Sequence, residues 1–178
     1  MLGTTDCSWV SSFVQPTLCY SGQMRGVSLA SLNCPVARTL EIVGERWTLL
    51  VLRDAFNGVR RFDDFAARLP IARNVLANRL RTLVAHGILD RQPYQEHPPR
   101  YEYRLTQAGM ELYPVIVGLM QWGNRHRMGD ASGTLEVRHK GCGHEAEATV
   151  VCSGCGERLS GRDVRGAWSR RTSLSPDA

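Results

Sequence analysis

The sequence predicts a mainly α-helical fold that carries one small β-hairpin, and three observations support this class. Two short helical patterns, at residues 63–69 and 72–85, are separated by Leu69-Pro70-Ile71, where the proline forces a sharp turn. After Gly87, two strand patterns flank a loop that contains two prolines. Further helical patterns lie on both sides of this stretch. A helix-turn-helix followed directly by a hairpin is a winged helix-turn-helix.

Composition limits the class of protein. At 178 residues and 43% hydrophobic content, the chain is long enough for one domain with a real core and some appendages. No run reaches the roughly 18 apolar residues of a membrane span, so we expect a soluble, cytoplasmic protein with no membrane partner. The net charge of +5 favours a polyanionic partner without establishing one. Six cysteines without a secretion signal indicate metal binding or redox sensing rather than disulfides.

The first segment, residues 1–27, shows no helical or strand period, and we expect it to be disordered. An alternative is that translation starts at Met24, where an ordered pattern begins. Cys7 and Cys19 fall in this segment and are interpreted as incidental.

Two helices are expected before the helix-turn-helix. Pro35 suits a first helical position because its φ is already helical and it has no N–H to lose, which makes Cys34 the predicted N-cap. This helix should end near Gly44. The nearly continuous apolar run of residues 47–56 then indicates a buried helix that ends at Asn57-Gly58.

The predicted helix at residues 72–85 has two contrasting faces. One is apolar, formed by Leu76, Leu80, Leu83 and Val84 at spacings of three and four. The other carries amide and guanidinium groups, on Asn74, Asn78 and Arg81, flanked by Arg73 and Arg79. Asparagine can bond bidentately to adenine and arginine to guanine or phosphate, so this face suits double-stranded DNA. An ordinary solvated helix face is the competing interpretation.

The hairpin is predicted from residues 89–94 and 101–105, which alternate apolar and polar side chains. Its polar tip is stiffened by Pro98 and Pro99 and ends in Arg100. A rigid loop with a cation at its tip could enter a minor groove, where the negative potential is concentrated. The alternative is a plain hairpin loop.

A long helix is expected after Thr106, its predicted N-cap, with Pro114 either kinking it or marking its effective start. An apolar stripe runs along it, formed by Leu112, Val115, Ile116, Leu119 and Trp122. Because the winged helix is already complete, this stripe needs a partner, and a second protomer is the economical choice. Folding back onto the same domain is the alternative.

A Cys-rich segment, residues 134–165, follows a polar linker at residues 130–133. Its candidate zinc ligands are Cys142, His144, Cys152 and Cys155, with His139 as an alternative to His144. Zinc prefers four S or N ligands. A segment this short has no hydrophobic core of its own, so it needs a bound metal ion to fold into a small zinc-ribbon-like β unit. A metal-free hairpin and a redox-active thiol pair are the alternatives. Residues 166–178 are expected to be a disordered tail.

Several motifs occur together between Asn33 and about Arg127: CPV, GERWTLLVLRDAF, RRFDDF, NVLANRLRTLVAHGIL, PPRYEYRLT and LYPVIVGLMQWG. This stretch resembles the HxlR-type winged helix-turn-helix transcription regulators, relatives of the MarR-type repressors. The resemblance implies a homodimer that binds promoter DNA through residues 72–85 and a wing at 98–100, with terminal helices at the dimer interface and a domain spanning about 33–130. Ala72 and Ala77 occupy positions that are often polar in the family. The operator sequence of a family member therefore cannot be assigned to this chain.

The resemblance also gives Cys34 a candidate role, because family members with a cysteine here look like sensors of oxidants or electrophiles. A thiol at a helix N-terminus is made more reactive by unpaired N–H groups, although a capping and packing role is the alternative. The sequence therefore predicts a dimeric transcription regulator, a repressor without enzymatic activity, that responds to an oxidant, an electrophile or a small-molecule effector. A thiol oxidoreductase using Cys152 and Cys155, or a protein-docking module, is the alternative.

Overall fold

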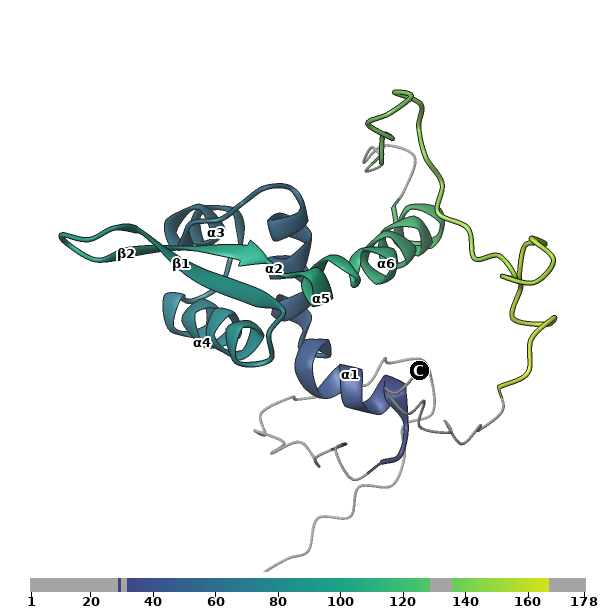
Figure 1. Cartoon of the computed structure of the whole chain (residues 1–178), viewed down its shortest axis with the longest axis horizontal. Coiled ribbons are helices and arrows are strands. Elements are labelled where there is room, and N and C mark those ends of the chain that lie inside the picture. Colours follow the sequence, from purple (N-terminus) through teal and green to yellow (C-terminus); the bar gives the residue numbers. More distant parts are fainter. Residues whose placement is uncertain (1–28, 30–31, 129–135, 167–178) are drawn as a thin grey trace, which may run out of the picture.

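The computed structural model describes residue 29 and residues 32–128 and 136–166. The described elements are α1 (Pro35–Val43), α2 (Arg46–Phe56), α3 (Phe62–Arg68), α4 (Arg73–Ala85), β1 (Leu89–Gln95), β2 (Arg100–Leu105), α5 (Gln107–Met110) and α6 (Tyr113–His126). This order confirms the predicted winged helix-turn-helix (Figure 1). The expectations for residues 1–27, the linker 130–133 and the tail beyond residue 166 lie outside the described residues.

Helix α1 begins at Pro35, as the sequence predicts. Cys34 is the N-cap, with extended backbone and no side-chain cap hydrogen bond, and Pro35 follows in the first turn. The next helix, α2, is capped by Glu45, whose carboxylate accepts hydrogen bonds from the amides of Trp47 at 2.9 Å and Thr48 at 3.3 Å. These bonds satisfy two N–H groups that have no partner within the helix. The sequence analysis did not identify this cap.

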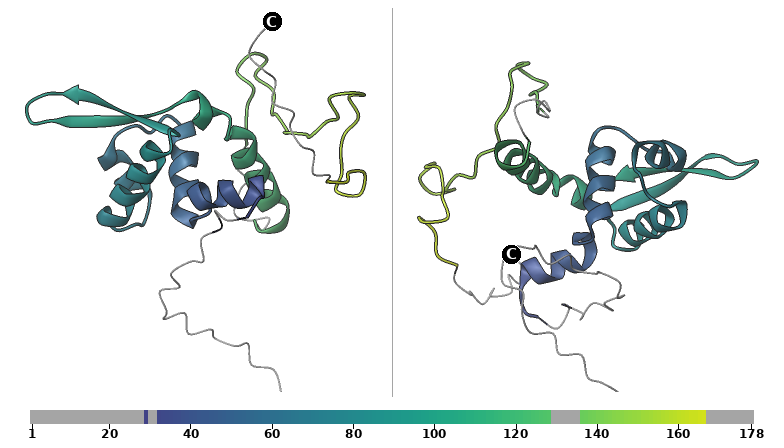
Figure 2. Two further views of the ribbon diagram at one scale, coloured as in Figure 1. Left: turned by 60° about the horizontal axis from the view of Figure 1, so that its bottom comes forward. Right: turned by 180° about the vertical axis from the view of Figure 1, so that it is seen from behind.

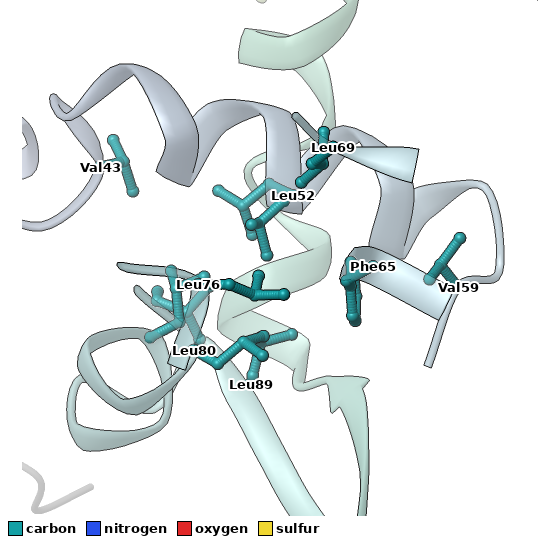
Figure 3. Close-up of a cluster of buried hydrophobic side chains, with 11 residues drawn as sticks. Val43, Leu52, Val59, Phe65, Leu69, Leu76, Leu80 and Leu89 are labelled. Atoms are coloured by element: carbon teal, nitrogen blue, oxygen red, sulfur yellow. The ribbon is translucent and has the colours of Figure 1, made fainter. Parts of the chain in front are cut away.

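The core lies between α2, α3, α4 and the start of β1 (Figure 3). Leu76, Leu80 and Leu83 on α4 are fully buried, as their spacing predicts, and Phe65 of α3 packs with them. Leu52 of α2 is also fully buried and lies in the same cluster. Burying a leucine or phenylalanine contributes roughly 1.5–3 kcal/mol, so this cluster fixes how α4 is oriented.

The wing is an antiparallel pair of strands with Leu89 opposite Leu105 and Pro93 opposite Tyr101. Its register shifts between Pro93 and Gln95, a bulge at the place where proline has no N–H to donate. The hairpin is tied to the helix-turn-helix by an isolated bridge between Arg61 and Glu102. In Figures 1 and 2 it projects away from the end of the molecule that holds α1 and α6.

The predicted long helix after the wing is divided into two. Thr106 caps the short α5, accepting a hydrogen bond from the amide of Gly109 at 3.1 Å and donating one to the carbonyl of Gly87 at 2.6 Å. Pro114 then lies in the first turn of α6. The proline therefore marks a helix start, because an interior proline would remove a main-chain hydrogen bond.

The apolar stripe of α6 does not act as one surface. Leu112 and Ile116 pack against the core of their own domain, and Val117, which the stripe does not include, is buried. Val115, Leu119 and Trp122 remain exposed. Folding back onto the same domain therefore accounts for part of the stripe, and the rest is left exposed within one chain.

The Cys-rich part, residues 136–166, forms two turns, each closed by an isolated bridge: Arg138 with Glu145, and Val151 with Arg158. Longer strands are absent from this described part, and none of its residues is buried. The expected zinc-ribbon-like β unit thus consists of two separate turns in this structure. No helix among the described residues is both long enough and apolar enough to cross a bilayer.

Candidate nucleic-acid interface

The polar face of α4 is exposed along the helix. Asn74, Asn78 and Arg81 all face solvent, opposite the buried leucines. The Oδ1 atom of Asn78 accepts a hydrogen bond from Nη1 of Arg81 at 3.2 Å, so the two side chains are held together. Oδ1 of Asn74 accepts one from the amide of Val75 at 2.9 Å. This leaves the amide NH₂ groups and the remaining guanidinium donors facing solvent.

The two arginines expected to flank this face are placed differently from each other. Arg73 donates to Asp63 of α3 at 2.6 Å, and its guanidinium lies 4.8 Å from the centre of the Phe62 ring. Both charged side chains of this pair are well exposed, so the pair contributes little stability and can exchange for another anion. Arg79 is half-buried, and its Nε makes no hydrogen bond to any described residue.

An open cleft of about 420 Å³ lies between the start of α3 and the wing, with Tyr94, Tyr101, Tyr103, Phe62, Arg61 and Arg100 in its lining. Arg61 stacks on Tyr94 at 4.5 Å, and Arg91 stacks on Tyr101 at 3.5 Å. Arg100, the tip residue, is exposed and has no ion pair with a described residue. The sequence analysis missed Arg61 and Arg91, because each stacks on a tyrosine that is distant from it in the sequence.

Positive charge is concentrated in this region. Residues 60–104 hold nine arginines and five carboxylates, a net charge of +4 out of +5 for the whole chain. Phosphate contacts by arginine are charge-assisted and commonly bidentate. The helix-turn-helix and the wing are therefore the part of the chain that a polyanion would contact.

Large apolar side chains are also exposed on two helices away from the wing, α1 and α6. Val36 and Leu40 on α1 are 67% and 47% exposed, and Val115, Leu119 and Trp122 on α6 are 47%, 51% and 49% exposed. Large side chains this exposed at spacings of three and four are unusual for a face that stays in water. An apolar cleft of about 240 Å³ between α2 and α6 is lined by Leu49, Leu50, Arg53, Ile116, Leu119 and Met120.

The four cysteines among the described residues form no disulfide. Cys34 is half-buried at the start of α1. In the Cys-rich part, Nδ1 of His139, rather than an atom of His144, lies 3.2 Å from Sγ of Cys142. The main-chain N–H groups of Cys155 and Gly154, with the Cys155 side chain, hold the pKa of the Cys152 thiol below its ordinary value. Among the residues that the structure describes, no three possible ligands gather around one point.

Residues 42–131, slightly more than half of the chain, match the family described as HxlR-like helix-turn-helix. The chain belongs to this family. The HxlR-like match covers α2 to α6, the elements that carry the exposed α4 face and the wing. The predicted family is therefore confirmed.

Named relatives agree with this assignment. The chain is 50% identical over 129 residues to Rv3095 of Mycobacterium tuberculosis, an uncharacterized HTH-type transcriptional regulator, covering 72% of this chain and 82% of that protein. The crystal structure of PA1607, a candidate transcription factor, superposes with a TM-score of 0.73 at 35% identity, over 80% of this chain and all of that one. The reduced form of the redox regulator HypR gives 0.50 at 35% identity, over 53% of this chain and 94% of HypR.

These comparisons decide the class of activity. The protein is a transcriptional regulator with a helix-turn-helix DNA-binding domain, and its family consists of regulators rather than enzymes. The alternative that the whole chain is a thiol oxidoreductase is not supported.

Proposed function

We propose that this regulator is a cytoplasmic homodimeric repressor that inserts α4 into the major groove of double-stranded promoter DNA. The observation that carries the proposal is the division of α4, which buries three leucines and leaves Asn74, Asn78 and Arg81 exposed. In this arrangement Asn78 and Arg81 read base edges and Asn74 contacts the bases near the start of the helix.

Other side chains supply phosphate and minor-groove contacts. Arg73 exchanges Asp63 for a phosphate, Arg79 contacts the backbone from the edge of α4, and Arg100 enters the minor groove at the tip of the wing. Ala72 is the N-cap of α4 and makes no side-chain cap hydrogen bond, so it offers no side-chain contact to a phosphate. Recognition therefore depends more on the remaining polar residues and on DNA shape.

The dimer is proposed from the exposed apolar residues of α1 and α6. A second copy that covers Val115, Leu119 and Trp122 removes them from water, and two-fold dimers match the symmetry of paired half-sites. These residues belong to α6, which lies at the end of the chain's fold opposite the wing, so covering α6 would leave both wings free to contact DNA (Figure 1).

Two forms of regulation are compatible with this surface. Cys34 caps α1, so a peroxide that oxidises its thiol to a sulfenic acid, and is itself reduced to water, would place a new polar group beside the dimer helices. The likeness to HypR, a redox regulator, favours this role. Alternatively, an apolar small molecule could occupy the cleft between α2 and α6 and change how two copies pack.

Sequencing the DNA fragments that the purified protein retains would identify the operator, and variants would then test the groove assignment. We expect Arg81→Ala to cost about 1–3 kcal/mol in operator binding and to relax sequence preference at one position. Arg100→Ala should weaken binding more evenly across sequences and make the salt dependence shallower. Arg162→Ala removes the same charge outside the winged helix and should change neither. Operator binding by both variants at the wild-type level would refute the assignment.

A further inference from the structure

The Cys-rich part contains a turn whose main-chain hydrogen bonds form a regular set. The amide of His139 donates to the carbonyl of His144 at 3.0 Å, and the amide of Gly143 donates back to the carbonyl of His139 at 2.8 Å. Outside them, the amide of Ala146 donates to the carbonyl of Val137 at 2.7 Å. The turn thus reverses the direction of the chain within six residues and is closed by three main-chain hydrogen bonds.

Thirteen residues later the chain repeats this turn bond for bond. The amide of Cys152 donates to the carbonyl of Glu157 at 2.8 Å, and the amide of Gly156 donates to the carbonyl of Cys152 at 2.8 Å. The amide of Leu159 donates to the carbonyl of Val150 at 2.9 Å. Two turns of the same construction in so short a segment indicate that both serve the same purpose.

The two turns also have glycine at the same positions, the third and the fifth. Gly143 and Gly156 occupy the fifth position, with φ of +73° and +77°, a region that favours glycine. At the third position, a Cβ on Gly141 would lie 3.0 Å from Cε1 of His139. Glycine there leaves the first side chain of the turn free to fold over it.

The first and fourth positions of each turn carry the metal-binding side chains. In the first turn, Nδ1 of His139 lies 3.2 Å from Sγ of Cys142. Two ligands of a tetrahedral zinc, with bonds of about 2.0 Å to nitrogen and 2.3 Å to sulfur, are separated by about 3.5 Å. In the second turn, Cys152 and Cys155 occupy the same positions, and their side chains interact. The first turn therefore already presents two donors at close to the spacing that zinc requires, and the second turn carries two thiols at the same two positions.

We propose that His139, Cys142, Cys152 and Cys155 bind one zinc ion, with each turn supplying two ligands. This assignment replaces His144 with His139, because the main chain of His144 closes the turn at its sixth position while the ring of His139 faces the cysteine. Three thiolates and one imidazole are a common ligand set for structural zinc.

The two turns lie apart in this structure (Figures 1 and 2), and metal binding has to bring them together. Residues 136–166 have no buried side chain that would hold them apart, and Val150 and Val151 between the turns are 69% and 52% exposed. A segment without a core gains its folded state from the metal, as small zinc modules do.

The connection between the turns contacts the folded domain through an exposed ion pair. Glu147 lies between them, with its carboxylate 3.3 Å from Arg125 of α6 and 3.8 Å from Arg158 of the second turn. Closing the turns around zinc would therefore form a compact unit next to the C-terminal half of α6.

Zinc content of the full-length protein, produced in zinc-supplemented medium under reducing conditions and dialysed, tests this site. We expect about one zinc per chain, as four-ligand structural sites hold. Cys152→Ser and His139→Ala should each lower the retained zinc at least tenfold, whereas His144→Ala, the matched control, should retain it. Loss of zinc from His144→Ala but not from His139→Ala would overturn the assignment. So would zinc-free wild-type protein, or one zinc shared between two chains.

Cobalt gives a second measurement that does not depend on zinc affinity. Replacing zinc with Co²⁺ should produce thiolate-to-metal charge-transfer absorption and the intense visible bands of a tetrahedral site. His139→Ala should change the visible bands while His144→Ala leaves them unchanged. A Cys152–Cys155 disulfide in the protein purified under reducing conditions, detected as a mass two hydrogens lower, would instead support a redox pair and overturn the proposal. Unchanged thermal unfolding of the winged helix in each variant shows that any loss is local.

Discussion

The ion pair between Arg73 and Asp63 restrains one of the cations proposed to contact DNA. Asp63→Asn releases Arg73 and removes a negative charge from the DNA-facing region. We expect severalfold tighter operator binding, because Arg73 then reaches its phosphate without first giving up the Asp63 carboxylate. Operator titration at one fixed salt concentration measures this.

The adjacent Asp64 provides the control for this change. Asp64 is exposed in the same turn of α3 and has no ion pair with a described residue. Asp64→Asn removes the same charge without releasing an arginine, so it should tighten binding less. Equal operator affinities for the two variants would show that release of Arg73 contributes nothing to binding.

At the scale of one element, α4 separates stability from recognition. Leu80 is fully buried, and Leu80→Ala should lower the free energy of unfolding by about 2–5 kcal/mol. Asn78, two residues earlier, is exposed, and Asn78→Ala should change stability by less than about 0.5 kcal/mol. Operator binding by the folded protein should fall for Asn78→Ala, by about 1–3 kcal/mol. Denaturant unfolding combined with operator titration separates the two effects, and a large stability loss in Asn78→Ala would contradict this division.

Helix α2 depends on its cap, because Glu45 satisfies two amides at the start of a helix that supplies the fully buried Val51 and Leu52. Glu45→Ala should lower the free energy of unfolding by about 0.5–2 kcal/mol. Glu96→Ala, at the exposed tip of the wing, is the control and should have little effect. Thermal unfolding measures both, and equal midpoints would show that the cap contributes nothing.

Most elements could be predicted because their signals are local. The turn at Pro70, the spacing of the leucines on α4 and the helix start at Pro35 each depend on a few neighbouring residues. What could not be predicted depends on contacts between distant residues. Leu112 and Ile116 look like Leu119 along the helix, and only packing against the core distinguishes them.

The candidate site follows the same rule. The exposed face of α4 follows from its helical period, so Asn74, Asn78 and Arg81 could be assigned from the sequence. The pairing of Arg73 with Asp63 joins two helices and could not. Likewise, His139 and His144 are equivalent in the sequence until the turn directs one ring toward Cys142.

At the scale of the whole molecule, the wing projects away from α1 and α6, the helices that carry the exposed apolar residues (Figure 2). The apolar residues are therefore available to a second copy without obstructing DNA. A dimer doubles the number of phosphate contacts and requires two half-sites, so loss of dimerisation should weaken operator binding even though α4 is intact.

Leu119→Glu tests this arrangement. Leu119 is 51% exposed in one chain, so a glutamate there can remain solvated in the monomer, whereas burying its unpaired charge between two copies costs several kcal/mol. We expect sedimentation to show a monomer, with unfolding of the isolated chain little changed and operator binding reduced. Met110→Glu is the matched control, because Met110 is also 51% exposed but lies on α5. If the dimer instead persisted in Leu119→Glu and dissociated in Met110→Glu, the interface would lie on α5 and not on α6. The cleft between α2 and α6 would then lie away from the second copy.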